Sequence, residues 1–188
     1  VTALVASLGV ASLAVALALQ DTLANFFAGI YVMADRPVRV GDFVRLENGE
    51  DGYVEEIGWR STKVRTLPNN IIVIPNSKLA QSIITNYYLP SEETSFVVKC
   101  GVAYGSDLDK VEKVTVKVAK EVQQTVEGAT RDFEPFIRFN EFGDSNINFS
   151  IIIRVDEPVA KYIVLHELIK RLTKAYEKEG IEISLPVR

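Results

Sequence analysis

The sequence is poor in the residues that build disulfides, metal sites and catalytic centres, with one cysteine and one histidine among 188 residues. A single cysteine excludes a disulfide within the chain and a zinc site made of several thiolates. A single histidine excludes most catalytic and metal sites that depend on this residue, so we expect neither metal nor cofactor. Basic residues number 21 against 25 acidic ones, and the net charge of −4 argues against broad nucleic-acid binding.

Charge is absent from the first 20 residues, which contain only Ala, Leu, Val, Ser, Thr, Gly and Gln. A helix of this length is about 30 Å long, the thickness of the hydrocarbon core of a bilayer. The segment therefore predicts a transmembrane helix, with a helix buried in a soluble core as the alternative. Because the chain starts inside this run and without Met, we expect it to be a fragment of a longer protein.

Small residues recur on two faces of this expected helix. The first set is Ala3, Ser7, Ala11, Ala14 and Ala18, and the second is Ala6, Gly9, Ser12 and Ala16. Membrane helices pack closely through such faces, so the pattern fits a ring of identical helices. Leu13 and Leu17 lie one turn apart on a single face. In a ring, the two leucines form two apolar collars around the axis, which can block ions by dewetting. The alternative is that both leucines face lipid.

Polar residues mark the end of the apolar run. Gln20 and Asp21 precede an amphipathic stretch, residues 22–33, and Arg36 and Arg39 follow it. Basic residues beside a span tend to be cytoplasmic. Asp21 can be the N-cap of a new helix that begins at the next residue, which we favour. The alternative is a ring of carboxylates at the pore mouth, which would favour cations.

Short apolar and alternating runs separated by turn residues follow from Val38 to Asn86. The expected strands are residues 38–46, which alternate around a turn at Gly41-Asp42 and so give two short strands, and residues 52–57, 60–66 and 71–74, with Pro75 and Asn76 closing the last of these. Five short strands with tight turns predict a small open barrel.

The remaining chain predicts the order strand, helix, strand, strand, helix, strand. The expected elements are a strand at 94–104, a helix with a capping box at Ser106–Asp109, a hairpin of 136–142 and 146–155, a helix from Pro158 to Gly180 and a strand at 181–185. This order is typical of a ferredoxin-like fold.

Candidate catalytic residues are few, and each has a simpler structural explanation. His166 precedes Glu167 without the second histidine of a zinc-protease helix, so we interpret it as a solvated or packed residue. Cys100 is interpreted as a small core residue. The charged residues from Lys170 to Glu179 are interpreted as a solvated helix face. We expect no catalytic residue, and hence no enzyme.

Seven segments together carry a family resemblance. They are Leu13–Gln20, Asn25–Gly29, Arg36–Val44, Gly52–Ile57, Arg60–Thr62, Val64–Thr66 and Ile71–Asn76. In this order and spacing they resemble the small-conductance mechanosensitive channel (MscS) family, over about residues 6–87. The rest of the chain is compatible with the carboxy-terminal domain of that family.

The resemblance implies a homoheptamer in a lipid bilayer, with the apolar helix lining the pore. Leu13 and Leu17 match the two hydrophobic gate positions. The positions that match the contact between neighbouring helices are Ala6, Val10 and Ala14 on one side and Gly9, Ser12 and Ala16 on the other. Gly29 matches a hinge position, whereas Asp21 stands where well-known members have a hinge glycine. Val10, Ser12 and Ala16 are bulkier than the commonest choices, which implies a wider or less mobile ring.

The expected fold class is membrane α+β, comprising a transmembrane pore helix (1–34), an Sm-like β-barrel domain (35–90) and a ferredoxin-like α/β domain (91–188) whose final barrel strand is truncated. The expected function is a tension-gated channel that releases ions and small osmolytes in hypo-osmotic shock. The alternatives are a membrane-anchored oligomeric scaffold and a ligand-gated channel of the same fold. We expect the cell membrane as the location, the inner membrane in a Gram-negative source, with cytoplasmic soluble domains and no nucleic-acid partner.

Overall fold

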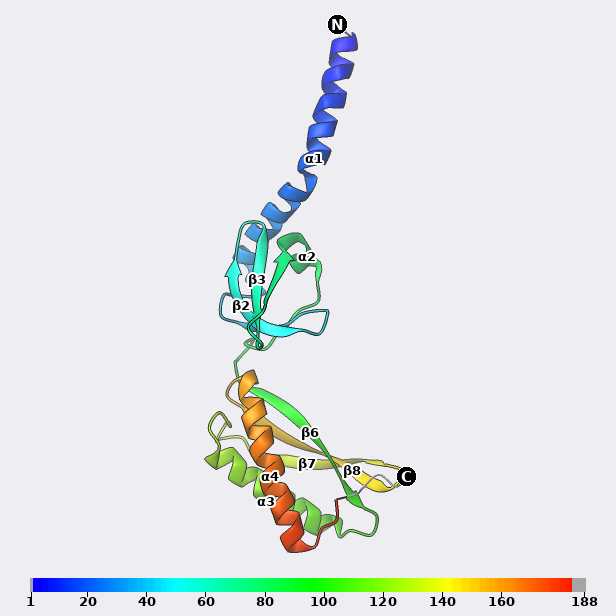
Figure 1. The fold of residues 1–188 in the computed structure, drawn as a ribbon, viewed down its shortest axis with the longest axis vertical. Coiled ribbons are helices and arrows are strands. Elements are labelled where there is room, and N and C mark those ends of the chain that lie inside the picture. The colour runs from blue at the N-terminus through cyan, green and yellow to red at the C-terminus, as the bar shows by residue number, and fades with distance from the viewer. Residues whose placement is uncertain (1, 184–188) are drawn as a thin grey trace. The chain divides into compact units, whose positions relative to one another are not determined.

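The computed structural model describes the backbone of residues 2–183 and the side chains of residues 8–183. The chain forms two compact units, Val1–Leu89 and Pro90–Arg188. Figure 1 shows the first unit as a long helix joined to a small β-sheet, and the second as a sheet with helices on one face.

The first unit contains two helices and five short strands. In chain order they are α1 (Thr2–Asp35), β1 (Phe43–Arg45), β2 (Asp51–Ile57), β3 (Ser61–Thr66), β4 (Ile71–Pro75), α2 (Asn76–Gln81) and β5 (Thr85–Asn86). The strands form one antiparallel sheet in the order β4-β3-β2-β1-β5. The sheet is open between β4 and β5, in agreement with the expected open barrel.

The end of α1 is anchored in the core of the β unit. Val32 is fully buried and packs in one cluster with Val44, Val54 and Val64 of the sheet and Leu79 of α2. Directly after the helix, Arg36 adopts a left-handed conformation, φ 53°, and its N–H donates to the carbonyl of Val32 at 3.0 Å. A residue with positive φ cannot continue a right-handed helix, so α1 ends where the sheet begins.

The second unit contains three strands and two long helices. They are β6 (Thr94–Ala103), α3 (Leu108–Thr125), β7 (Phe136–Phe142), β8 (Asn146–Val155) and α4 (Lys161–Glu179), with a 3₁₀ turn at Pro158–Ala160 before α4. The sheet order is β6-β8-β7, and Ile183 forms an antiparallel bridge to Val102 on the free side of β6. This arrangement is the predicted ferredoxin-like fold. Of the strand predicted for 181–185, Ile183 pairs at this bridge, and residues 184 and 185 lie outside the described residues.

Alternation along β8 separates the two faces of this sheet. Every second residue from Ile147 to Val155 is buried under α3 and α4, and the residues between them are only partly buried. A strand with one covered face shows this period of two. The core of the second unit is therefore formed entirely by its own residues.

Three local predictions differ from the structure. The N-cap of α3 is Asp107, whose Oδ1 accepts a hydrogen bond from Lys110 N at 3.1 Å, rather than Ser106. The predicted turn at Gly41-Asp42 is present, with φ 98° at Gly41, but of the stretch 38–46 only Phe43–Arg45, after this turn, forms a strand. Helix α2 was not predicted, since Pro75 and Asn76 were interpreted only as a strand end.

Candidate functional site

The predicted gate residues lie on one row of α1, and their side chains are largely exposed. Leu13 and Leu17 are 61% and 63% exposed. The side chains of residues 8–24 are all exposed, including Gly9, Val10, Ser12, Ala14 and Ala16 of the predicted helix-packing set, and Gln20 and Asp21. The side chain of Ala6 lies outside the described residues. This part of α1 therefore offers its whole surface to lipid or to other chains.

The structure corrects the prediction of a helix break at Asp21. Helix α1 continues through this residue, and the carbonyl of Asp21 accepts a hydrogen bond from Nδ2 of Asn25 at 2.8 Å. The reason is the sequence that follows, since residues 22–33 contain no proline and can extend the same helix. Asp21 is thus a helix-interior residue one turn beyond Leu17, with an exposed side chain, and not an N-cap.

Gly29 is also inside the continuous helix, and its small size serves a close contact. A Cβ atom at this position would lie 2.6 Å from Nδ2 of Asn76 and 2.9 Å from the carbonyl oxygen of Trp59. The helix backbone therefore lies directly against the β2–β3 turn and the start of α2. Any side chain would push these elements away from the helix.

Asn25 and Ser77 form a polar junction that the sequence analysis missed. Oδ1 of Asn25 accepts hydrogen bonds from the backbone N of Ser77 at 3.0 Å and from its Oγ at 2.9 Å. Asn25 is 8% exposed, so these bonds satisfy a buried polar group. One sign was available in the sequence, namely a single asparagine between apolar residues of a helix, but its partner 52 residues away was not.

Asn76 extends this junction into the sheet. Its Oδ1 accepts from Oγ1 of Thr62 at 2.9 Å, and its Nδ2 donates to the carbonyl of Gly58 at 2.8 Å. Asn76 and Thr62 are both fully buried. Helix α1, the β2–β3 turn and α2 are therefore held together by a network of buried hydrogen bonds, which makes the end of α1 and the β unit one body.

The two predicted juxtamembrane arginines follow α1 and are exposed. Arg36 ends the helix, as described above. The backbone N of Arg39 donates to Oδ2 of Asp42 at 2.8 Å, and Oδ2 of Asp42 also accepts from Nδ2 of Asn86 at 2.6 Å. These bonds fix the loop between α1 and β1, whereas both guanidinium groups remain available at the surface.

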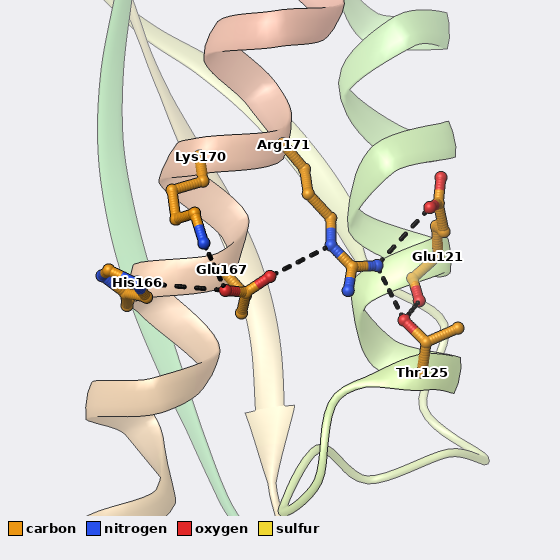
Figure 2. A network of polar contacts seen from close by, with 6 residues as sticks. All are labelled: Glu121, Thr125, His166, Glu167, Lys170 and Arg171. Atoms are coloured by element: carbon orange, nitrogen blue, oxygen red, sulfur yellow. Dashed lines mark hydrogen bonds and ion pairs between the residues drawn. The ribbon is translucent and has the colours of Figure 1, made fainter.

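The second unit has a polar network on its helices, drawn in Figure 2. Nη1 of Arg171 on α4 donates to Oγ1 of Thr125 on α3 at 2.7 Å and lies 3.5 Å from Oε1 of Glu121. The hydrogen bond from Lys170 to Glu167 is the main cause that lowers the pKa of this carboxyl group. These exposed pairs link the two helices and agree with the interpretation of a solvated face.

His166 and Cys100, the single histidine and the single cysteine, lie in different surroundings. The side chain of His166 is 67% exposed, and its Nε2 lies 4.0 Å from Oε1 of Glu167. Burial raises the pKa of the Cys100 thiol to about 11, so it is protonated at neutral pH. Within residues 2–183 no three histidine, cysteine, aspartate or glutamate side chains are placed to hold a metal ion.

Two models of mechanosensitive channel domains match successive segments of the chain. Residues 21–89 match the family described as mechanosensitive ion channel, beta-domain, and residues 96–183 match the one described as mechanosensitive ion channel MscS, C-terminal. Residues Leu8–Asp35 form the one helix of the described part that is long and apolar enough to cross a membrane.

Individual relatives carry the same description. The small-conductance mechanosensitive channel MscMJ of Methanocaldococcus jannaschii is 36% identical over 99% of this chain and 52% of its own length. A small-conductance mechanosensitive channel of Helicobacter pylori is 33% identical over 97% of this chain and 64% of its own length. The chain spans about half the length of the first curated relatives that it matches.

Solved structures agree with the fold. The crystal structure of Helicobacter pylori MscS in the closed state superposes with a TM-score of 0.83 at 31% identity, covering 100% of this chain and 72% of that one. Arabidopsis thaliana MSL1 shares the fold, with a TM-score of 0.70 at 20% identity, over 95% of this chain and 64% of its own. With one structural relative above 30% identity and both family domains in order, the chain belongs to the MscS family of mechanosensitive channels.

Proposed function

We propose that this chain is the pore-forming part of a channel subunit that membrane tension opens, releasing ions and small osmolytes during hypo-osmotic shock. The observation that carries the proposal is the exposure of the whole apolar half of α1. Its large exposed side chains are Leu8, Val10, Leu13, Val15, Leu17 and Leu19. Each costs about 1.5–3 kcal/mol when left in water, so lipid or neighbouring helices must cover them.

A ring of such helices provides a gate without any further group. Leu13 and Leu17 face the axis, and the small residues Gly9, Ser12 and Ala16 receive the neighbouring helix. We propose a homoheptamer, on the strength of the resemblance. Two collars of leucine in a narrow pore exclude water, and therefore ions, until tension separates the helices.

Asp21 follows Leu17 by one helical turn, so the same face carries a carboxylate just beyond the gate. In a ring these carboxylates attract cations and repel anions at the pore mouth. The resulting channel is weakly selective and favours cations. Gln20 adds uncharged polar groups at the same level.

The remaining parts of the chain are assigned to the cytoplasmic side of a cell membrane. Arg36 and Arg39 follow the helix directly, and basic residues beside a span are enriched on that side. We keep the division into a pore helix (1–34), an Sm-like domain (35–90) and a ferredoxin-like domain (91–188). The last two surround the cytoplasmic entrance, which ions and osmolytes cross.

The proposal is tested with the full-length protein in liposomes, by recording excised patches under a suction ramp in asymmetric salt. Reversible conductance steps at a reproducible tension are expected. The Leu13→Ser and Leu17→Ser variants should open at lower tension, because a hydroxyl group helps the constriction to wet. Val15→Ser is the matched control, since Val15 lies on another face of the helix and should leave the threshold unchanged.

Selectivity is measured in the same patches. Asp21→Asn should move the reversal potential toward zero and leave the tension threshold near that of the wild type. Silence up to patch rupture, with insertion demonstrated, would refute the channel and favour the oligomeric scaffold. Opening only after a ligand is added would favour the ligand-gated alternative.

A further inference from the structure

The sheet of the second unit carries a polar hollow of about 360 Å³, a volume within the range of small-molecule sites. Lys99 pairs with Ser150, which alternates with the buried residues of β8 and so lies on the face opposite α3 and α4 (Figure 1). The hollow is lined by Lys99 and Cys100 of β6, Asn140 and Glu141 of β7, and Asn148 and Phe149 of β8. It therefore lies entirely within the second unit.

A β-bulge in β7 brings two consecutive polar side chains to this hollow. The pairing of β7 with β8 shifts between Phe139 and Glu141, and Asn140 is the extra residue. Nδ2 of Asn140 donates to Oγ of Ser150 at 2.8 Å. Oε2 of Glu141 accepts from Nδ2 of Asn148 at 3.1 Å. In a regular strand Asn140 and Glu141 would point to opposite faces, so the bulge is what places both at one site.

Lys99 and Glu141 bring opposite charges to the hollow without pairing with each other. Among the described residues neither has an ion pair, whereas Lys110, Lys120 and Arg154 of the same unit all have acidic partners. Strand β8 lies between β6 and β7, so the stems of the two side chains are about 10 Å apart across the sheet. The hollow thus contains two separated charges of opposite sign, each without a charged partner.

The asparagines add acceptors to the acidic end of the hollow. The amide oxygens of Asn140 and Asn148 have no donor among the described residues. Together with the Glu141 carboxylate they suit an ammonium group, which has three N–H donors, while the Lys99 ammonium suits a carboxylate. A ligand with a single charge would leave one of the two side chains uncompensated. Within residues 2–183 no three acidic, histidine or cysteine side chains are placed to hold a metal ion.

We propose that this hollow binds small zwitterions that carry one carboxylate and one ammonium group, the chemistry of free amino acids. Lys99 binds the carboxylate, and Glu141 with the two asparagine amides binds the ammonium group. The site goes beyond the proposed channel function and does not depend on how α1 opens. Loss of one charged hydrogen bond reduces affinity by about tenfold or more, so both ends of the ligand are required for measurable binding.

Three probes of equal chain length separate the two charges. 4-Aminobutyrate carries both, butyrate carries only the carboxylate, and butylamine carries only the ammonium group. Binding to the full-length protein in detergent is measured by ligand-observed saturation-transfer NMR. Labelling of Lys99 by an amine-reactive reagent, followed by mass spectrometry, locates the bound ligand. We expect saturable binding of 4-aminobutyrate that protects Lys99, with binding of butyrate and butylamine at least tenfold weaker.

Two substitutions each remove one end of the site. Lys99→Gln should weaken 4-aminobutyrate at least tenfold and leave butylamine unchanged, because only the carboxylate loses its partner. Glu141→Gln should weaken 4-aminobutyrate equally and leave butyrate unchanged. Both side chains are exposed, so neither substitution disturbs the core. The matched control is Lys113→Gln at an exposed position of α3, which changes the net charge as Lys99→Gln does and should leave all binding unchanged.

Several outcomes would overturn the proposal. Equal binding of 4-aminobutyrate and butylamine would indicate a site for simple cations, and displacement of 4-aminobutyrate by calcium chloride at constant ionic strength would indicate a metal site. Protection of Lys99 before any probe is added would show that a neighbouring chain covers the hollow. Patch recordings test the channel separately. A silent protein that binds 4-aminobutyrate refutes only the proposed function, whereas a conducting protein that does not bind it refutes only this site.

Discussion

Asn25 is the residue on which the attachment of the apolar helix to the β unit depends most directly. It is almost fully buried, and its Oδ1 is the acceptor for both the N and the Oγ of Ser77. Since the N–H of Ser77 belongs to the first turn of α2, it has no partner within that helix. Loss of Asn25 would therefore leave a donor unsatisfied next to the core.

We predict that Asn25→Ala lowers the free energy of unfolding of the first unit by about 1–3 kcal/mol, the cost of a buried donor without a partner. Ser77→Ala removes only the hydroxyl donor and should cost about 1 kcal/mol. Denaturant unfolding in detergent, followed by Trp59 fluorescence, measures both. An equal and negligible effect of the two substitutions would contradict the assigned junction.

Gly29 and Gly9 both lie within α1, and they form a matched pair of positions for testing the contact between this helix and the β unit. The position of a Cβ at Gly29 lies within 3 Å of backbone and side-chain atoms of the β unit, whereas Gly9 has nothing within 4 Å. Gly29→Ala should destabilise the first unit, because about 1–3 kcal/mol of overpacking exceeds the roughly 1 kcal/mol gained in helix propensity. Gly9→Ala should instead increase helicity in detergent. Circular dichroism during thermal unfolding measures both, and a stabilised Gly29→Ala variant would refute the close contact.

At the scale of single elements, the position of Cys100 in strand β6 determines how readily its thiol ionises. Burial raises the pKa of Cys100 from 9.0 to about 11, so at pH 8 the folded chain holds about a hundredfold less thiolate than the unfolded chain. We predict slow alkylation at pH 8, with a rate that increases until about pH 11. Measurement of alkylation rate against pH, with the denatured chain as control, tests this; a rate profile centred near 9 in the folded state would contradict it.

The same shift has a consequence for stability. The folded state binds the thiol proton more tightly than the unfolded state, so the stabilisation is complete below pH 9 and is lost as the pH rises toward 11. Tyr176, whose pKa is raised to about 12 chiefly by burial, acts in the same direction at higher pH. Both groups favour folding of the second unit at neutral pH.

The elements differ in how well the sequence predicts them. The strands of β2, β3 and β8 and the ends of α4 follow from alternation, Pro158 and Gly180, since these signals are local. Helix α2 has only six residues, and its stability comes from Leu79 in the core and Asn76 in the junction, which are tertiary contacts. A sequence pattern does not contain such contacts.

In the candidate site, too, features with a local sequence signal were predicted, and features that depend on tertiary contacts were not. The spacing of Leu13 and Leu17 is visible in the sequence, because both lie on one helix. The continuity of α1 through Asp21 was not predicted, since an aspartate after an apolar run also fits an N-cap. The contact between Asn25 and Ser77 joins segments 52 residues apart, and spacing alone cannot identify such a pair.

At the scale of the whole molecule, two separate hydrophobic cores determine stability. One contains Val32, Val54 and Val64 of the first unit, and the other contains Phe149 and Leu168 of the second. No residue belongs to both clusters. The two units should therefore respond independently to damage in either core.

We predict that Phe149→Ala destabilises the second unit by about 3–5 kcal/mol, because it leaves a cavity beneath α3 and α4. Protection of amides in the first unit should not change, and Val54→Ala should produce the opposite pattern. Hydrogen exchange resolved by peptide measures both variants in one experiment. Loss of protection in both units after either substitution would show that they unfold together.

The unbroken course of α1 gives the molecule a mechanical property. The helix backbone rests on the β unit at Gly29, and Leu13 lies 16 residues away, or about 24 Å along the axis. Since α1 is continuous between these points, a tilt of the helix about its contact with the β unit moves Leu13 sideways. A tilt of about 10° moves it by about 4 Å over this length. A small rotation at the contact with Gly29 thus becomes a displacement as wide as a side chain at the level of Leu13.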